Sequence, residues 1–190
     1  MGGTNKGAAL VAPKGAATRP TSDRMRETIF NILAHRFGGV ADDTRVLDLF
    51  AGTGAMGLEA ISRGAAFALF VENSPGARGT LRTNMAAVNA TSRARVWRRD
   101  ATKLGACPVA PFDLIFCDPP YGRDLGVAAL AAALDGGWVS DDALAVLEER
   151  RGSVPERLSG WQRLDGRKTG ESEIVFLRPD TKEEPENLLP

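Results

Sequence analysis

The sequence is poor in the residues that build several common kinds of functional site. It contains one histidine, one tyrosine and two cysteines among 190 residues. Cys107 and Cys117 cannot form a disulfide framework and have no metal-ligand cluster near them, so we expect reduced intracellular thiols and no metal centre. His35 falls near the end of a predicted helix, and no serine–aspartate pattern accompanies it. Disulfide scaffolds, metal centres and serine hydrolases are therefore not favoured.

The sequence also lacks the segments that place a chain in or on a membrane. No apolar run approaches the length of a membrane span. The opening segment, "MGGTNKGAAL", has no basic region followed by an apolar one, and Lys6 stands where a myristoylation motif needs serine or threonine. We therefore expect a soluble, cytoplasmic, monomeric protein with no membrane partner.

Net charge is absent overall but present locally. The 24 basic and 24 acidic residues cancel at pH 7, so charge alone indicates neither a nucleic-acid nor a membrane partner. Basic residues exceed acidic ones in residues 1–40, and acidic residues dominate from Pro179 onward. Residues 1–20, rich in glycine, alanine and proline, predict an extended arm or hairpin. Residues 21–178 predict a single domain, and residues 179–190 a disordered acidic tail.

Strand and helix patterns alternate through the predicted domain. An amphipathic helix over residues 21–37 comes first, and short apolar runs that predict strands then alternate with helical patterns. The predicted strands cover residues 45–50, 66–72, 94–100, 112–118 and 143–149, the helices between them cover 54–64, 77–88 and 125–134, and a hairpin closes the domain over 161–168 and 172–178. This order predicts an α/β protein whose mainly parallel sheet is covered by helices on both faces.

A glycine-rich segment joins the first predicted strand to its helix. In "DLFAGTGAMG", Gly52, Gly54 and Gly57 satisfy the G-x-G-x-x-G pattern. Glu72 ends the next strand, at about the distance expected of a ribose-binding acid. On this pattern alone the ligand could be a nicotinamide dinucleotide. A tight turn without any ligand is also open, because a lone glycine pattern is a weak signal.

Acidic residues at the strand ends favour a different cofactor. Asp48 ends the first strand and is expected to face the ligand crevice, where its carboxylate would repel a pyrophosphate. S-adenosylmethionine (SAM) has no phosphate and carries an ammonium and a sulfonium, so it complements this charge. Glu72 can accept both ribose hydroxyls, and Asp100 can accept from the adenine amino group. The predicted SAM-binding residues are Asp48, Phe50, Ala51, Gly52, Thr53, Gly54, Glu72, Asn73, Asp100 and Ala101.

The fourth strand ends in "CDPPYG", an unusual exit from an apolar run. The exocyclic amine of a nucleobase is planar, and it attacks a methyl group only when its nitrogen becomes more tetrahedral. Asp118 can hold one N–H bond through its carboxylate, and Pro119 the other through a carbonyl that the consecutive prolines keep in place. Tyr121 offers a flat ring on which the base can stack. The predicted catalytic residues are Asp118, Pro119, Pro120 and Tyr121; the alternative is a turn that only ends the strand.

The chain resembles the SAM-dependent N-methyltransferases that carry a (D/N)-P-P-(Y/F/W) motif, and more narrowly the bacterial 16S rRNA guanine-N2 methyltransferases. The narrow similarity rests on "TRPTSDRMRETIFNIL", "VLDLFAGTGAMGLEAISRGA", "FDLIFCDPPY" and "RKTGESEIVFLR". The resemblance implies a Rossmann-like, three-layer sandwich with seven strands, of which the last is antiparallel. It also implies SAM as the cofactor and, as the substrate, a guanine of 16S rRNA in the small ribosomal subunit or its assembly intermediate.

The resemblance further implies an RNA contact near the beginning of the chain. Arg19, Arg24 and Arg26 lie in or beside the most diagnostic segment, and we expect them to bind RNA. The family's arm usually carries an arginine-rich stretch, whereas this arm offers only Lys6, Lys14 and Arg19. A second basic cluster could supply the missing charge, or could be a solvated strand end: Arg93, Arg95, Arg98 and Arg99.

Other functions stay open from the sequence. Adenine N6 in DNA or RNA and a protein glutamine also present planar amines, so the motif at Asp118 does not separate them from guanine N2. A non-catalytic RNA-binding module could retain the fold, and an oxidoreductase could use the glycine pattern. The intact motif favours catalysis, and an oxidoreductase would have no use for the two prolines or Tyr121.

Overall fold

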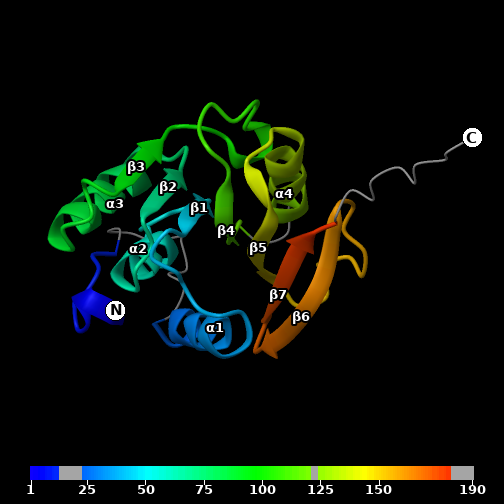
Figure 1. Ribbon diagram of the computed structural model, residues 1–190, viewed down its shortest axis with the longest axis horizontal. Helices are drawn as coiled ribbons and strands as arrows, with labels where there is room; N and C mark the ends of the chain where they lie inside the picture. The colour runs from blue at the N-terminus through cyan, green and yellow to red at the C-terminus, as the bar shows by residue number, and fades with distance from the viewer. Residues whose placement is uncertain (13–22, 121–123, 181–190) are drawn as a thin grey trace, which may run out of the picture.

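The computed structural model describes residues 1–12, 23–120 and 124–180, and a seven-stranded sheet forms its centre (Figure 1). The strands lie in the order β3-β2-β1-β4-β5-β7-β6. Their bounds are Arg45–Leu49 (β1), Phe67–Val71 (β2), Ala94–Trp97 (β3), Phe112–Cys117 (β4), Val139–Arg150 (β5), Trp161–Thr169 (β6) and Ser172–Pro179 (β7). Strands β3, β2, β1, β4 and β5 are parallel, and β7 pairs antiparallel with both β5 and β6. The predicted sheet, with its closing hairpin and antiparallel last strand, is therefore confirmed.

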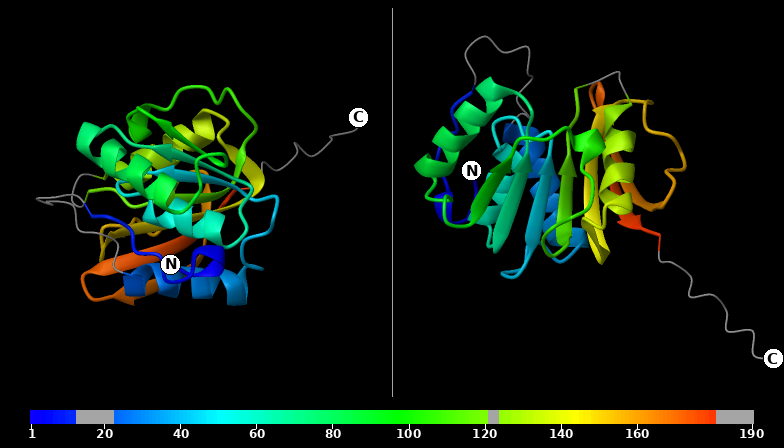
Figure 2. Two further views of the ribbon diagram at one scale, coloured as in Figure 1. Left: turned by 90° about the vertical axis from the view of Figure 1, so that its left-hand side faces the viewer. Right: turned by 90° about the horizontal axis from the view of Figure 1, so that it is seen from above.

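Helices cover both faces of this sheet (Figure 2). Helices α1, α2 and α3 contribute to the apolar cluster on one face, and α4 contributes to the cluster on the other. The helices cover Asp23–Arg36 (α1), Ala55–Ser62 (α2), Pro75–Ala87 (α3) and Leu125–Asp135 (α4), and short 3₁₀ helices cover Gly3–Asn5 (η1) and Ala101–Lys103 (η2). Because both faces are buried, the central strands β1, β2 and β4 are nearly continuous apolar runs. Within the described parts of the chain, no helix is both long and apolar enough to span a bilayer.

The alternation of side chains along β1 determines on which face of the sheet Asp48 lies. Val46 joins the apolar cluster beneath α1, α2 and α3, whereas Leu47 and Leu49 join the cluster beneath α4. Successive side chains of a strand point to opposite faces, so Asp48 lies on the same face as Val46. The carboxyl end of β1 therefore turns a buried carboxylate toward α2.

Two strand boundaries differ by more than one residue from those that the sequence predicts. Strand β5 begins at Val139, four residues before the predicted start, because Val139 pairs with Phe112 across a register irregularity. Residues 140–142 are polar, so the hydrophobic pattern did not predict this part of the strand. Strand β3 ends at Trp97 instead of Asp100, since its partner β2 ends at Val71 and pairing stops there.

The chain ends also depart from the predicted boundaries. The described part of the predicted arm, residues 1–12, contains η1, and Gly3 has a φ of +63°. A Cβ atom on Gly3 would lie 1.9 Å from the carbonyl oxygen of Ser62 in α2, so only glycine fits this contact. At the other end, Pro179 belongs to β7 and the amide of Asp180 donates to the carbonyl of Gly160 at 2.9 Å. The predicted acidic tail lies outside the described residues from position 181 onward.

Candidate active site

The glycine loop leaves β1 through a run of left-handed backbone conformations. Phe50 has a φ of +59°, Gly52 of +53° and Gly54 of +78°. The amide of Ala51 donates to the carbonyl of Val71 in β2 at 3.0 Å, which ties the start of the loop to the sheet. Phe50 is not a glycine, and a positive φ at such a residue is uncommon and mildly strained.

Two of the three glycines are required by packing, and one borders open space. A Cβ atom on Gly54 would lie 2.2 Å from Leu81 of α3, and one on Gly57 would lie 2.4 Å from the ring of Phe70. A Cβ atom on Gly52 would meet only the carbonyl oxygen of Phe50, at 3.9 Å. Gly54 and Gly57 therefore let the helices pack closely on the sheet, whereas Gly52 presents bare backbone toward space that a ligand can fill.

Glu72, just past the end of β2, holds the glycine loop in place. Its Oε2 accepts a hydrogen bond from the amide of Gly52 at 2.8 Å, and its Oε1 accepts from the amide of Ser74 at 2.7 Å. Its side chain is largely buried, while the neighbouring Asn73 is exposed and accepts at its carbonyl from Arg78 at 2.7 Å. The acid predicted to bind ribose thus also orders the loop at Gly52.

Asp48 lies deeper than its predicted position facing an open crevice. Its side chain is 4% exposed, and its Oδ2 accepts from the amide of Gly57 in α2 at 2.9 Å. Burial raises the pKa of Asp48 well above its ordinary value, and the nearby carboxylates of Asp118 and Glu72 raise it further, while the Gly57 hydrogen bond opposes them. Burial therefore disfavours the charged form of Asp48, and its hydrogen bond to Gly57 ties the end of β1 to α2.

Asp100 follows β3 and caps the short helix η2. Its Oδ1 accepts from both the amide and the hydroxyl of Thr102, at 2.9 and 2.7 Å. These hydrogen bonds lower the pKa of Asp100, whose side chain is exposed. Ala101, the first residue of η2, is buried. Asp100 is thus accessible to a ligand, and one of its carboxylate oxygens is already used in the cap.

Strand β4 ends at Cys117, and the predicted catalytic motif begins at the next residue. Asp118 is half-buried, Pro119 is buried and Pro120 is exposed, while Tyr121 lies outside the described residues. Asp118 lines a pocket at the carboxyl end of the sheet, between β4, β5, α1 and α2. The other residues that line this pocket are Ile29, Met56, Phe116, Cys117, Val146 and Glu148.

Glu148 is a pocket residue that the sequence analysis left out of the site. Cys117 of β4 pairs with Leu147 of β5, and the next residue of each strand is Asp118 and Glu148. Both carboxyl-bearing residues line the same pocket, although Glu148 is almost fully buried. Asp118 and Glu148 are 30 positions apart in the sequence, so only the strand register brings them together. The position of Glu148 directly after the apolar run 143–147 was the one available signal.

The carboxyl edge of the sheet is therefore strongly acidic. Burial raises the pKa of the Cys117 thiol well above its ordinary value, and the carboxylates of Asp118, Glu149 and Asp48 raise it further, so this thiol is not a nucleophile. Among the described residues there is no group of three or more histidine, cysteine or acidic side chains that could hold a metal ion. This edge favours a cationic ligand over an anionic one.

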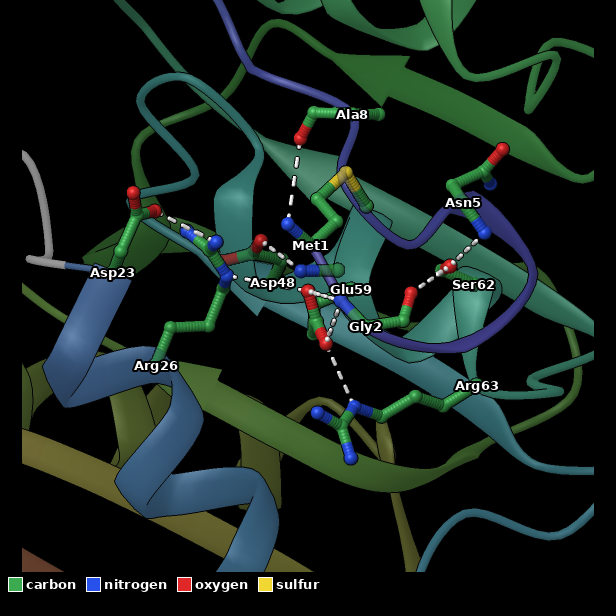
Figure 3. A network of polar contacts seen from close by, with 11 residues as sticks. Met1, Gly2, Asn5, Ala8, Asp23, Arg26, Asp48, Glu59, Ser62 and Arg63 are labelled. Atoms are coloured by element: carbon green, nitrogen blue, oxygen red, sulfur yellow. Dashed lines mark hydrogen bonds and ion pairs between the residues drawn. The ribbon is translucent and has the colours of Figure 1, made fainter.

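The three arginines predicted to contact RNA differ in their surroundings. Arg24 is exposed on α1, and Arg19 lies outside the described residues. Arg26 is 6% exposed and its guanidinium pairs with Glu59 of α2 at 3.2 Å and with Asp23 at 2.7 Å (Figure 3). Arg26 is enclosed within the protein and joins α1 to α2, so these contacts add no support to its predicted role in binding RNA.

The second basic cluster is also engaged with the protein itself. Arg93 donates to the carbonyls of Ile61 and Ala65, Arg95 donates to the carbonyl of Ala94, and the guanidinium of Arg99 lies over the ring of Trp97. These contacts orient the side chains along the edge strand β3. For Arg93, Arg95 and Arg99, these contacts favour the second interpretation, a strand end that serves no ligand.

The strand order, with β7 inserted antiparallel between β5 and β6, and the acidic edge beside a glycine loop define the chain as a Rossmann-like methyltransferase. Solved structures agree with this class. A putative methyltransferase, yhhF, from Escherichia coli superimposes with a TM-score of 0.80 and 34% identity, covering 96% of this chain and 97% of that chain. A putative methylase from Haemophilus influenzae, HI0767, has a TM-score of 0.70 and 28% identity, covering 84% and 99%.

The chain belongs to the family described as "Conserved hypothetical protein 95", which matches residues 1–178. It is 38% identical to ribosomal RNA small subunit methyltransferase D of Escherichia coli (strain K12), over 85% of this chain and 79% of that protein. It is 36% identical to the putative rRNA methyltransferase YlbH of Bacillus subtilis (strain 168), over 82% of this chain and 85% of that protein. The predicted family resemblance, fold class and methyltransferase activity are thereby confirmed.

Proposed function

We propose that the protein transfers a methyl group from SAM to the exocyclic N2 amine of a guanine in 16S rRNA. One observation carries this proposal: Asp118, followed by Pro119, leaves β4 at a pocket on the acidic edge of the sheet, close enough to Asp48 to raise its pKa. Relatives named as rRNA small subunit methyltransferases support rRNA as the substrate. The sequence motifs that resemble guanine-N2 methyltransferases support the choice of amine.

The residues of the glycine loop and the strand ends fit SAM. The space beside Gly52 is open: a Cβ atom built there would have no neighbour closer than 3.9 Å. The cofactor can therefore approach the backbone at Gly52. Each oxygen of Glu72 accepts one amide, and a carboxylate oxygen has lone pairs left for a ribose hydroxyl. Asp100 would accept from the adenine amino group. The other acidic residues of this edge, Glu72, Asp100 and Asp118, would complement an ammonium and a sulfonium, and they disfavour a pyrophosphate.

The chemistry at the amine follows from two fixed acceptors. SAM supplies an electrophilic methyl group on a sulfonium, so the target nitrogen needs an available lone pair and no strong base. Asp118 and the carbonyl of Pro119 would each accept one N–H bond, which turns the nitrogen lone pair out of the base plane. After transfer the nitrogen is cationic and acidic, and Asp118 or water would take its proton. The gain is one of orientation and preorganised charge.

Tyr121 and the two prolines complete the proposed base site. Tyr121 lies outside the described residues, and we assign it on sequence grounds as the ring on which the base stacks, an interaction worth about 1–3 kcal/mol per base. Pro119 is buried against α4, where a Cβ atom on Gly126 would lie 3.2 Å from its ring. This packing would keep the accepting carbonyl from moving as the base binds.

The RNA partner would be the small ribosomal subunit or its assembly intermediate. Lys6 is exposed on the arm and Arg24 is exposed on α1. Together with Arg19 they would neutralise RNA phosphates. Arg26 is left out of this set because it pairs with Glu59 and Asp23. Residues 21–178 would form the catalytic domain, acting as a monomer in the cytoplasm.

Methyl transfer from labelled SAM tests this function. Small subunits from a strain that lacks the corresponding enzyme are incubated with the protein, in parallel with naked rRNA, DNA and a protein extract. The labelled material is digested, and the modified nucleoside is identified by mass spectrometry. We expect N2-methylguanosine from the small subunit. Label in N6-methyladenosine or in a protein glutamine would overturn the assignment of the amine, and no label in any substrate would overturn catalysis.

A further inference from the structure

Residues 1–11 lie along α2 and α3, and several of their backbone groups bond to those helices. The amide of Gly2 donates to Glu59 at 2.9 Å, and the amide of Asn5 donates to the hydroxyl of Ser62 at 2.8 Å. The Gly2 contact is visible in Figure 3, where this segment crosses the end of α2. These contacts secure the beginning of the segment. Its far end, at Val11, is held by a different residue.

Asn84 of α3 holds both Val11 and the glycine loop. Its Oδ1 accepts from the amide of Val11 at 2.8 Å, and its Nδ2 donates to the carbonyl of Val11 at 3.1 Å. The same Nδ2 donates to the carbonyl of Thr53 at 3.0 Å, and Thr53 stands between Gly52 and Gly54 in the loop. Both amide hydrogens and the amide oxygen of Asn84 therefore have partners, and the side chain bridges two segments that are 42 positions apart.

The position of Asn84 argues against a role in filling the core. It is 0% exposed and sits one turn beyond Leu81 and next to Met85, two apolar residues packed on the same face of the sheet. Burying an amide among apolar side chains is unfavourable unless its hydrogen bonds are all made. Here they are made, and their geometry fixes Val11 and Thr53 relative to each other. An apolar side chain of similar size could pack there without fixing either segment.

We propose that Asn84 is a positioning residue that couples the order of residues 1–11 to the conformation of the glycine loop. The inference rests on the proposed function, because it treats that loop as the place where SAM binds. A ligand that orders Thr53 thereby favours the Asn84 conformation that also holds Val11. By linkage, the held segment in turn strengthens ligand binding to the same degree. Cofactor binding would then also order residues 1–11, which carry Lys6, before RNA binds.

S-adenosylhomocysteine, the product of the donor, is the probe. Its dissociation constant is measured by calorimetry for the full chain and for Asn84→Ala. The state of residues 1–11 is followed by trypsin cleavage after the exposed Lys6, with and without the probe. We expect Asn84→Ala to raise the dissociation constant about tenfold, which is a usual size for coupling between two sites. In the wild-type chain the probe should slow trypsin cleavage after Lys6, and in Asn84→Ala it should not.

Two further variants separate coupling from a loss of folding. Val11→Pro removes the amide that donates to Asn84 and leaves α3 unchanged, although it also replaces the side chain, fixes φ at position 11 and restricts Leu10. It should weaken probe binding by a smaller factor than Asn84→Ala, and it should add little to Asn84→Ala. Asn5→Ala loses a side-chain contact to Val88 at the other end of the segment. It should speed cleavage after Lys6, and it should weaken probe binding by less than Asn84→Ala does, because the contacts of Asn84 with Val11 and Thr53 remain.

The outcomes distinguish this inference from the proposed function. Wild-type chain that fails to bind the probe would overturn both. Wild-type chain that binds it, with an unchanged dissociation constant in folded Asn84→Ala and in Val11→Pro, would overturn the coupling and leave the methyltransferase assignment intact. Effects of Val11→Pro and Asn84→Ala that add fully in the double variant would also count against the coupling.

Discussion

Asp118 and Glu148 follow paired residues of neighbouring parallel strands, and both line one pocket at the carboxyl edge of the sheet. Both residues also interact with other groups of the protein. Two acidic residues thus meet at this end of the sheet, and only the strand register brings them together. In the proposed function, Asp118 would accept from the N2 amine of guanine.

Asp118→Ala should remove methyl transfer while leaving cofactor affinity close to that of the wild type. In the proposed function the carboxylate would act on the target amine, so its loss would affect the transition state more than the binding of SAM. We expect kcat to fall by about a hundredfold or more, since removing a preorganised hydrogen-bonding group of this kind has effects of that size. Single-turnover transfer to small subunits and calorimetry with S-adenosylhomocysteine measure the two quantities. Retained turnover would show that Asp118 is not the acceptor.

Glu148→Gln should weaken the use of RNA without weakening cofactor binding. A glutamine accepts through one oxygen and carries no charge, so it holds a base edge less well than a carboxylate does. Hydrogen bonds to charged groups contribute about 1.5–3 kcal/mol, which corresponds to a loss of roughly tenfold or more in kcat/KM. Asp142→Asn on the exposed start of β5 is the matched control. A raised dissociation constant for S-adenosylhomocysteine in Glu148→Gln would instead assign this carboxylate to the cofactor.

The raised pKa of Asp48 predicts a particular dependence of stability on pH. The folded protein holds the Asp48 proton more tightly than the unfolded chain does, so the contribution of this group is fully present below its ordinary pKa. It is lost as the pH rises through the folded-state pKa, where a charge forms in a buried site. Asp48→Asn keeps an acceptor for the Gly57 amide and carries no charge. Its free energy of unfolding should therefore exceed that of the wild type at pH 8, and the difference should shrink toward pH 4.

Urea unfolding of both proteins across that pH range measures this difference. A difference that stays constant with pH would mean that Asp48 does not titrate with a raised pKa. The exposed variant Asp43→Asn serves as the control, because a surface carboxylate should change the pH dependence very little.

Glu59→Ala should strongly destabilise the fold. Glu59 is 2% exposed and accepts from Arg26, Arg63 and the amide of Gly2. Its removal leaves the buried Arg26 paired, among the described residues, with the exposed Asp23. Breaking a buried pair by removing one member lowers stability by about 3–5 kcal/mol. The exposed Glu27→Ala should change the free energy of unfolding by no more than about 0.5 kcal/mol. Equal effects of the two substitutions in urea unfolding would contradict this role.

Much of the fold could be predicted because its signals are local. The alternation of strands and helices, the hairpin of β6 and β7 and the glycine loop each depend on residues that are close in sequence. The errors fall where a local signal misleads. Polar residues hid the start of β5, and the end of β3 depends on where its neighbour β2 ends.

The candidate site was only partly predictable. Asp118 and Glu72 follow apolar strands, and that position in a parallel sheet marks them as edge residues from sequence alone. The basic character of Arg26 suggested an RNA contact, yet its charge is used inside the protein, because Glu59 comes to it from another helix.

The sequence by itself therefore determined the class of fold and the residue types at the carboxyl edge of the sheet, since hydrophobic period and turn residues act over a few positions. Only the tertiary structure decided which distant residues meet there: Glu148 beside Asp118, and Asn84 between Val11 and Thr53. Strand register and helix packing bring these groups together, and both depend on contacts between residues far apart in the chain, which no local pattern records.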